Sequence, residues 1–177
     1  MRSTFLLLDD IAAQLEKDFK GHVFDNKTGV MEPNIWIGGV PPKRSGPPEA
    51  EKQPINPGDP PYILIKYLGD VDTGETGNME ASIGILCAVY SLDSYVAIKN
   101  GYKDVLNMAD RVLLTLLSRR YWDDNHWWLG ESQIKRVCGL DREGNSVYEA
   151  GAQAHPIYGA MILATFKAAA IPRKLNK

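Results

Sequence analysis

The stretch Gly101–Arg120, GYKDVLNMADRVLLTLLSRR, decides the fold of this chain. Its apolar residues recur every three or four positions, which is the spacing of one face of an α-helix. We expect an amphipathic helix about 30 Å long, capped by Asn100, with Arg119 and Arg120 in its last turn, where positive charge suits the helix dipole. Its apolar face consists of Val105, Met108, Ala109, Val112, Leu113, Leu116 and Leu117.

Segments rich in strand-forming residues lie on both sides of this helix. The order of two strands, a long helix and two more strands indicates a single sheet with the helix lying across it. The expected strands are Tyr62–Leu68 and Ala81–Tyr90, joined by the turn Gly69–Asn78, and then Gln133–Val137 and Gly159–Phe166, with the turn Gly139–Asn145 between them.

The segment Gly159–Phe166 leaves two possibilities open. Its alanines favour a helix that runs to Ala170. Its position after Gln133–Val137 favours a strand that closes a hairpin, and we prefer the strand.

The N-terminal part of the chain has helical spacing over about residues 4–20. Ser3 or Thr4 can cap this helix, and Gly21 follows its end. Ile35–Ile37 is typical of a short strand. The apolar residues of the helix are Phe5, Leu8, Ile11, Ala12, Leu15 and Phe19.

Nine of the eleven prolines lie between Pro33 and Pro61. Proline removes amide donors and glycine costs order, so we expect no regular element over residues 38–61. This segment is either a disordered linker or an extended arm. The predicted fold class is therefore α+β. Residues 1–177 form one domain with a single mixed or antiparallel sheet of four to five strands, on which the helix 101–120 and the N-terminal helix pack.

Bulk properties exclude some classes of function. The formal net charge of −2 does not favour nucleic-acid binding, which usually needs a basic domain or stripe. No apolar run reaches the roughly 20 residues of a membrane span. Phe5–Leu8 is too short for the core of a signal peptide. Cys87 and Cys138 lie in apolar, strand-like runs, so we expect buried thiols in a reducing cytoplasm, with a disulfide as the alternative.

No motif for catalysis, phosphate binding or dinucleotide binding is present. We therefore expect no catalytic, cofactor or metal residues and do not expect an enzyme. The acidic turn around Gly74 fails the pattern of an EF-hand loop. His22, His126 and His155 show no ligand spacing, and Asp123, Asp124 and His126 are adjacent residues that rarely converge on one ion.

The segment YWDDNHWW at 121–128 gathers Trp122, Trp127 and Trp128. Such a cluster can be core, a surface for a protein partner or a platform for a sugar. The core interpretation places Trp122 and one of the later pair over the open end of the sheet and leaves the other partly exposed. As candidate partner or oligomer contacts we take these three tryptophans together with Pro41, Pro42, Pro47 and Pro48.

The order helix, long loop, hairpin, long helix, hairpin resembles the tail terminator, or tail completion, proteins of long-tailed bacteriophages and related neck proteins. Four segments carry the resemblance: PYILIKYLGD at 61–70, IGILCAVYSLD at 83–93, GYKDVLNMADRVLLTLL at 101–117 and HPIYGAMILATF at 155–166. The long proline-rich insertion at 38–61 and the tryptophan cluster depart from the family pattern.

The resemblance implies one mixed sheet with helices packed on it. It also implies a homo-oligomeric ring, usually of six copies, that ends tail-tube growth and contacts tail-tube and head-connector proteins. The protein would be assembled in the host cytoplasm and reside in the tail or neck of the virion, with no cofactor, membrane or specific nucleic acid. Terminator, head–tail joining and minor tail roles stay open.

Two other classes of function remain alternatives. One is a small-molecule or carbohydrate-binding module that uses Trp122, Trp127 and Trp128, and the other is an enzyme with an unrecognised site. The composition of residues 38–61 motivates one more hypothesis, that this segment embraces an adjacent subunit or a tail-tube partner.

Overall fold

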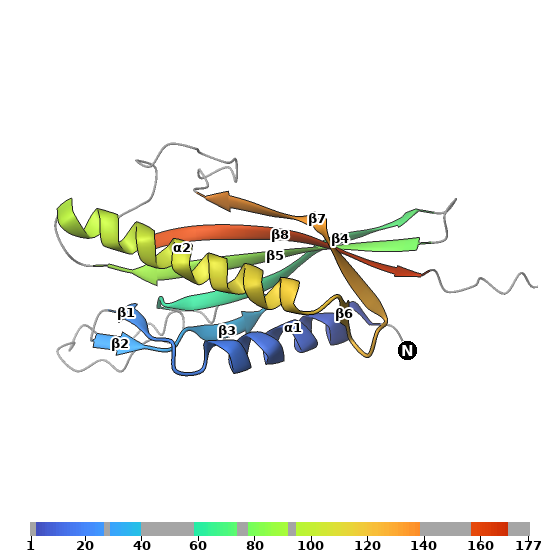
Figure 1. Cartoon of the computed structure of the whole chain (residues 1–177), viewed down its shortest axis with the longest axis horizontal. Coiled ribbons are helices and arrows are strands. Elements are labelled where there is room, and N and C mark those ends of the chain that lie inside the picture. Colours follow the sequence, from blue (N-terminus) through green and yellow to red (C-terminus); the bar gives the residue numbers. More distant parts are fainter. Residues whose placement is uncertain are drawn as a thin grey trace, which may run out of the picture.

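The computed structural model describes a mixed α+β protein with two helices and a curled, mixed sheet (Figure 1). The described residues are 3–26, 29–39, 59–73, 78–91, 95–138 and 157–169. The helices are α1 (Thr4–Phe19) and α2 (Tyr95–Ser118). The strands are β1 (Phe24–Asn26), β2 (Gly29–Met31), β3 (Asn34–Ile37), β4 (Tyr62–Thr73), β5 (Asn78–Tyr90), β6 (Tyr121–Trp122), β7 (Trp127–Cys138) and β8 (Ile157–Ala169).

The main sheet has six strands in the order β3-β4-β5-β8-β7-β6, with β3 parallel to β4 and every other pair antiparallel. The prediction of four to five strands is therefore too low for the described residues. The strand that the sequence did not predict is β6, because its two residues are too few to show any periodicity. A separate antiparallel ribbon pairs β1 with β2.

Strands β5 and β8 form the centre of the sheet and pair along their full length, from Asn78 with Ala169 to Tyr90 with Ile157. Gly159–Phe166 lies inside β8, so the preferred strand prediction is confirmed and the helix alternative is wrong. Pairing on both sides, with β5 and β7, outweighs the weak helix preference of the alanines.

The hairpin of β4 and β5 is longer than predicted. Both strands extend into the expected turn Gly69–Asn78, and a bulge between Tyr67 and Gly69 shifts the register, with Gly69 at a φ of 143°. Glycine adopts this backbone conformation without a steric cost, so the strand can bend there and continue.

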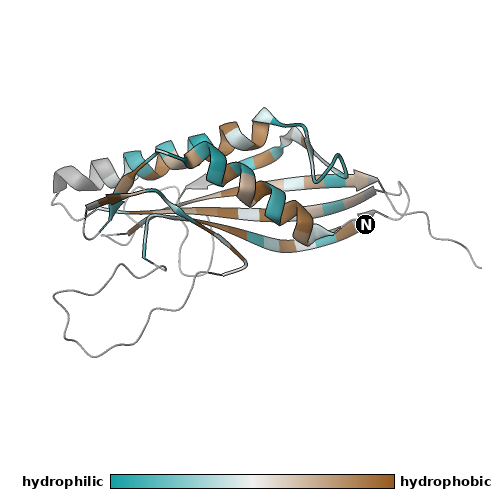
Figure 2. Cartoon of the chain, turned by 90° about the horizontal axis from the view of Figure 1, so that it is seen from below, coloured by the Kyte–Doolittle hydropathy of each residue, from teal (hydrophilic) through white to brown (hydrophobic). Residues whose placement is uncertain are grey.

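The two helices lie side by side on one face of the sheet (Figures 1 and 2). Helix α1 contacts β3 and β4, and α2 contacts β5, β8 and β7. Alternate residues of β4, β5 and β8 point toward these helices and are buried in one continuous core. This set consists of Ile63, Ile65, Ala81, Ile83, Ile85, Cys87, Val89, Tyr158, Ala160, Ile162, Ala164, Phe166 and Ala168.

Helix α1 begins and ends where the sequence predicts. The Ser3 hydroxyl accepts a hydrogen bond from the amide of Phe5 at 3.2 Å and caps the helix. The helix ends at Phe19, and Gly21 follows in the left-handed region with a φ of 81°. The sulfur-bearing side chain of Cys87 is buried, as expected.

Helix α2 begins earlier than the sequence predicts. It starts at Tyr95, so Asn100 lies inside the helix and is not its cap. Gly101 also lies inside the helix, and a Cβ there would come within 2.5 Å of the Tyr158 ring and 2.9 Å of the Ser91 Cβ. The glycine marks a close approach of α2 to β8 and not the first residue of the helix.

The end of α2 also differs from the prediction. The helix stops at Ser118, so Arg119 and Arg120 lie beyond its last turn. Of the expected apolar face, Val105, Met108, Ala109, Val112 and Leu116 are fully buried, whereas Leu113 is half-buried and Leu117 is exposed.

Several expectations lie outside the described residues. They concern the proline-rich segment over 40–58, the turn Gly139–Asn145, His155 and the side chain of Cys138. Of the helices in the described ranges, neither combines the length and the hydropathy that crossing a bilayer requires.

The β1–β2 ribbon brings two acidic residues near each other. Burial, reinforced by the negative charge of Asp25 on β1, raises the pKa of Asp104 on α2. The folded protein therefore holds this proton more tightly than the unfolded chain does. Stability falls as pH rises from the ordinary aspartate range through the raised pKa.

We expect Asp104→Asn to raise the melting temperature at pH 7, because it removes an ionised group from a partly buried position. The gain should shrink as pH falls below the aspartate range, and Asp25→Asn should reproduce part of it. Thermal unfolding followed by circular dichroism at several pH values checks this. A gain that is independent of pH would contradict the electrostatic cause.

The core face of α2 gives a second prediction. Leu116 has no exposed surface, whereas the Leu114 side chain is 68% exposed. We expect Leu116→Ala to lower the free energy of unfolding by about 2–5 kcal/mol, because it leaves a cavity under the helix. Leu114→Ala should change it by less than about 0.5 kcal/mol. Urea unfolding of both variants measures the difference, and equal losses would show that the helix is oriented differently.

Candidate functional site

The tryptophan cluster is part of the core. Trp122 and Trp127 have no exposed surface, and Trp128 is half-buried. The Trp122 ring packs edge-on against Phe166, with centroids 6.1 Å apart. The core interpretation of the cluster is thus confirmed. Neither Trp122 nor Trp127 presents a surface to a sugar or a partner in this conformation.

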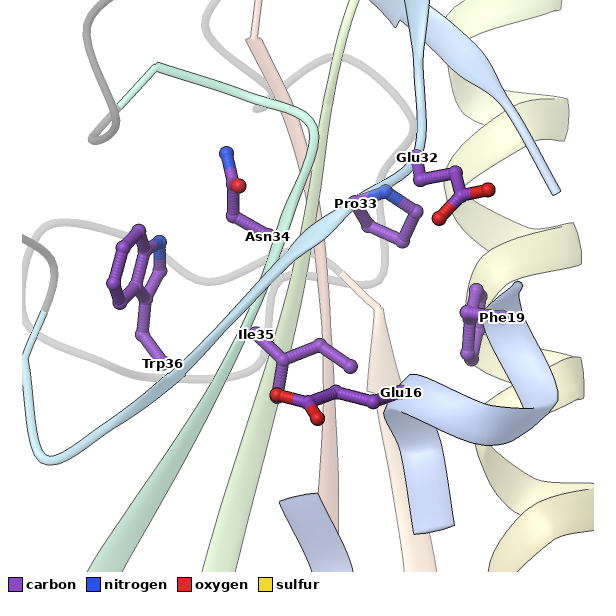
Figure 3. A pocket seen from close by; sticks show the side chains of 7 residues that line it. All are labelled: Glu16, Phe19, Glu32, Pro33, Asn34, Ile35 and Trp36. Atoms are coloured by element: carbon purple, nitrogen blue, oxygen red, sulfur yellow. The ribbon is translucent and has the colours of Figure 1, made fainter. Parts of the chain in front are cut away.

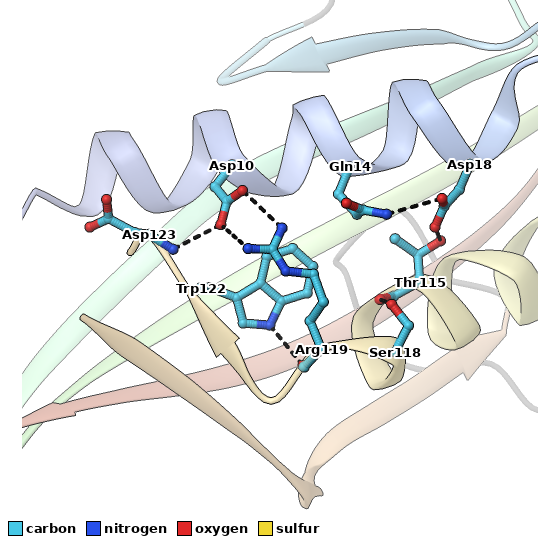
Figure 4. A network of polar contacts seen from close by, with 8 residues as sticks. All are labelled: Asp10, Gln14, Asp18, Thr115, Ser118, Arg119, Trp122 and Asp123. Atoms are coloured by element: carbon cyan, nitrogen blue, oxygen red, sulfur yellow. Dashed lines mark hydrogen bonds and ion pairs between the residues drawn. The ribbon is translucent and has the colours of Figure 1, made fainter. Parts of the chain in front are cut away.

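A polar network beside Trp122 ties α1 to the end of α2 and to the β6–β7 turn (Figure 4). The Asp10 carboxylate accepts two hydrogen bonds of 3.0 Å from the Arg119 guanidinium and one of 2.8 Å from the Asp123 amide. Arg119 lies over the Trp122 ring, and its carbonyl accepts a hydrogen bond from the indole nitrogen. These contacts join the two helices and the turn and stabilise the fold, whereas the buried Asp123 Oδ2 beside them has no hydrogen-bond partner.

A second set of contacts fixes the other half of α1. The Asp18 carboxylate accepts hydrogen bonds from Thr115 at 2.8 Å and from Gln14 at 3.0 Å. The Arg111 side chain donates to the Asp18 carbonyl and lies 5.9 Å from the Phe19 ring centroid. The two helices are thus joined by polar contacts above a shared apolar core.

The turn that carries Asp123, Asp124 and His126 is a tight reversal between β6 and β7. Asp123, Asp124 and Asn125 all have positive φ, at 48°, 50° and 68°. The Asp123 carbonyl accepts a hydrogen bond from the His126 amide, which closes the turn. In the part of the chain that the structure describes, no three His, Cys, Asp or Glu side chains gather as a metal ion requires.

The other face of the sheet carries apolar side chains that neither described helix covers. We call this surface the open face, and five of its residues are half-buried while Leu68 is half-exposed. Leu68 continues the alternation of Leu64 and Lys66 along β4 and lies against Gly84. The open face consists of Trp36, Leu64, Leu68, Leu86, Met161 and Leu163.

Strand register places four of these residues in one row across the sheet. Trp36 pairs with Leu64, Leu64 with Leu86, and Leu86 with Met161. Paired residues project to the same side, so the row is continuous over four strands. Exposed Lys66 and Lys135 lie in the neighbouring row, beside Leu163. An apolar centre with a charged margin is the composition of a protein-binding surface.

Sequence reasoning did not single out the open face. The feature of the sequence that indicates this face is the run Ala81–Tyr90, which hardly alternates between apolar and polar residues. Such a run indicates a strand with apolar side chains on both faces. Both described helices lie on the opposite face, so neither of them covers this second apolar face.

A groove lies at the outer edge of the sheet, between the second half of α1 and strand β3 (Figure 3). Its cavity has a volume of about 280 Å³. Figure 3 shows Asn34 and Trp36 on one side of β3 and Ile35 on the side of α1. We call this the edge groove, and its lining consists of Glu16, Phe19, Glu32, Pro33, Asn34, Ile35 and Trp36.

The edge groove is acidic. Glu16 and Glu32 are both exposed, and Glu32 accepts a hydrogen bond of 2.7 Å from the Gly21 amide. The indole nitrogen of Trp36 is buried and has no hydrogen-bond partner. The groove and the open face are adjacent, because Trp36 belongs to both.

Comparison with known proteins gives no relative from which a function could be transferred. The chain matches no protein-family model and no curated protein. The candidate surfaces therefore rest on the geometry of this chain alone.

The polar network gives a prediction about stability. We expect Asp10→Ala to lower the free energy of unfolding by about 1–3 kcal/mol, because Arg119 and the Asp123 amide lose a charged acceptor. Asp9→Ala is the matched control one residue away and should have a small effect. Chemical unfolding of both variants measures the difference, and equally small effects would show that the network contributes nothing.

Proposed function

We propose that this protein is a structural subunit of a bacteriophage particle, a tail terminator or head–tail joining protein that forms a ring at the end of the tail tube. In this role it has no catalytic site. It contacts copies of itself and the tail-tube and head-connector proteins, and its place is the tail or neck of the virion.

The order of elements supports this proposal. Helix α1, the β4–β5 hairpin, helix α2 and the β7–β8 hairpin follow one another as in the phage family that the sequence resembles. Fold order alone does not define a function. The proposal therefore depends on a second feature, the apolar face of the sheet that neither described helix covers.

The open face is the single observation that carries the proposal. A row of apolar side chains from Trp36 to Met161 crosses four strands on the face opposite the helices. A contiguous exposed apolar surface marks a contact site for another molecule. We assign it to the contact between neighbouring copies, where a face that meets a different patch on the next copy generates a closed ring.

No comparable observation favours the other classes. A carbohydrate-binding module would need exposed aromatic rings, and two of the three clustered tryptophans are buried. An enzyme would need a constellation of reactive groups, and among the described residues the Asp10 and Asp18 carboxylates are engaged in contacts that join the helices and the β6–β7 turn. The ring proposal relies on the open face, whose apolar side chains are partly exposed.

Light scattering after size-exclusion chromatography tests the proposal directly. We expect a defined oligomer with a mass near six times that of one chain. Met161→Glu should convert it to monomers, because a carboxylate in the apolar row of the open face cannot be buried without a partner. Leu114→Glu introduces the same charge on the outer side of α2 and should leave the mass unchanged.

A wild-type protein that stays monomeric at high concentration would contradict the ring. A ring that survives Met161→Glu would contradict the role of the open face. Circular dichroism of each variant separates a lost contact from a lost fold.

A further inference from the structure

The edge groove has the properties of a binding site for an extended chain. Strand β3 is an edge strand, and no described strand pairs with its outer side. The amides of Asn34 and Gly38 donate to the β4 side, to the carbonyls of Pro61 and Ile65. Successive amides of a strand point in opposite directions, so those of Ile35 and Ile37 point outward. An added strand can bond to them.

The chemistry of the groove selects a basic occupant. Glu16 and Glu32 supply two carboxylates on its walls, and the half-buried Ile35 supplies apolar surface. A segment that pairs with β3 would therefore carry cationic residues together with an apolar residue. Electrostatic complementarity of this kind fixes the partner and the register more than it adds affinity.

One segment of this chain fits that description. Residues 170–177, AIPRKLNK, follow β8 and contain Arg173, Lys174 and Lys177 with no acidic residue. Leu175 adds an apolar side chain. We propose that this segment of one copy binds the edge groove of the neighbouring copy by adding a strand to β3.

Distance excludes the groove of the same copy. Ala169, the last residue of β8, pairs with Asn78 at the start of β5. Ile37, the residue of β3 nearest to it, lies in the same row across the sheet as Ile85, which is seven residues further along β5. Seven residues correspond to about 23 Å, and three strand spacings from β8 to β3 add about 14 Å sideways. The near end of β3 is thus about 27 Å from Ala169, which uses the full reach of eight residues at about 3.3–3.6 Å each.

A neighbouring copy removes this restriction. In a ring each copy then donates one basic segment and accepts another, which is a head-to-tail contact. The inference rests on the proposed ring and names the contact that closes it. Because Trp36 belongs to both surfaces, a segment bound in the edge groove would lie next to the open face that contacts the neighbouring copy.

A charge-exchange experiment on the full chain tests the inference. The groove variant carries Glu16→Lys and Glu32→Gln, and the glutamine keeps an acceptor for the Gly21 amide. The second variant carries Arg173→Glu and Lys174→Glu. We expect each to weaken assembly by about tenfold or more in sedimentation equilibrium. Asp9→Lys, two turns before Glu16 on α1, is the control and should have no such effect.

Combining the variants distinguishes the possible occupants. A chain with both sets of changes should assemble again, and so should a mixture of the two variants, because each segment then meets an oppositely charged groove. Recovery in the chain that carries all four changes but not in the mixture would place the segment in its own groove and overturn the inference. No weakening by either variant would also overturn it while leaving the ring intact.

A peptide titration keeps the inference testable if the ring proposal fails. A fluorescent peptide of sequence AIPRKLNK should bind the variant with Arg173→Glu and Lys174→Glu, whose own segments do not fill the grooves. It should bind the groove variant at least tenfold more weakly, with affinity falling as salt rises. Binding to a monomeric wild-type protein would support the groove and contradict the ring. Equal binding to both proteins, or no binding to either, would overturn the inference.

Discussion

The packing of α2 against β5 and β8 is the contact on which the rest of the structure depends. Val105, Met108, Val112 and Leu116 fill the space under the helix. Gly101 lets the helix approach β8 closely enough for the Tyr158 ring to lie against its backbone. Because β5 and β8 are the central strands, this contact positions the helix layer over the whole sheet.

Polar contacts between the helices add to the apolar core that the helices share. Asp18 of α1 accepts a hydrogen bond from Thr115 in the last turn of α2, and Asp10 pairs with Arg119, which follows the end of α2. They hold α1 beside α2 on the same side of the sheet. The two described helices cover one apolar face of the sheet, and the second apolar face needs contacts that these helices do not supply.

The sequence predicts what depends on local periodicity and misses what depends on distant contacts. The spacing of apolar residues identified α1, α2 and the central strands. Gly101 misled the prediction of where α2 begins, because its role is a contact with Tyr158, 57 positions away. The burial of Trp122 was anticipated, but its bond to Arg119 depends on where α2 ends. The open face required the strand register, which a single sequence does not display.

The mixed topology of the sheet has a consequence for assembly. Strand β3 pairs in parallel with β4 and lies outside it in the sheet. This edge is therefore a strand of four residues and not the long β4–β5 hairpin. A short edge flanked by Glu16 and Glu32 disfavours pairing with arbitrary strands, because a neutral or acidic chain leaves the carboxylates unpaired. The same two charges favour a cationic strand. The groove therefore combines protection of the edge with selection of its partner.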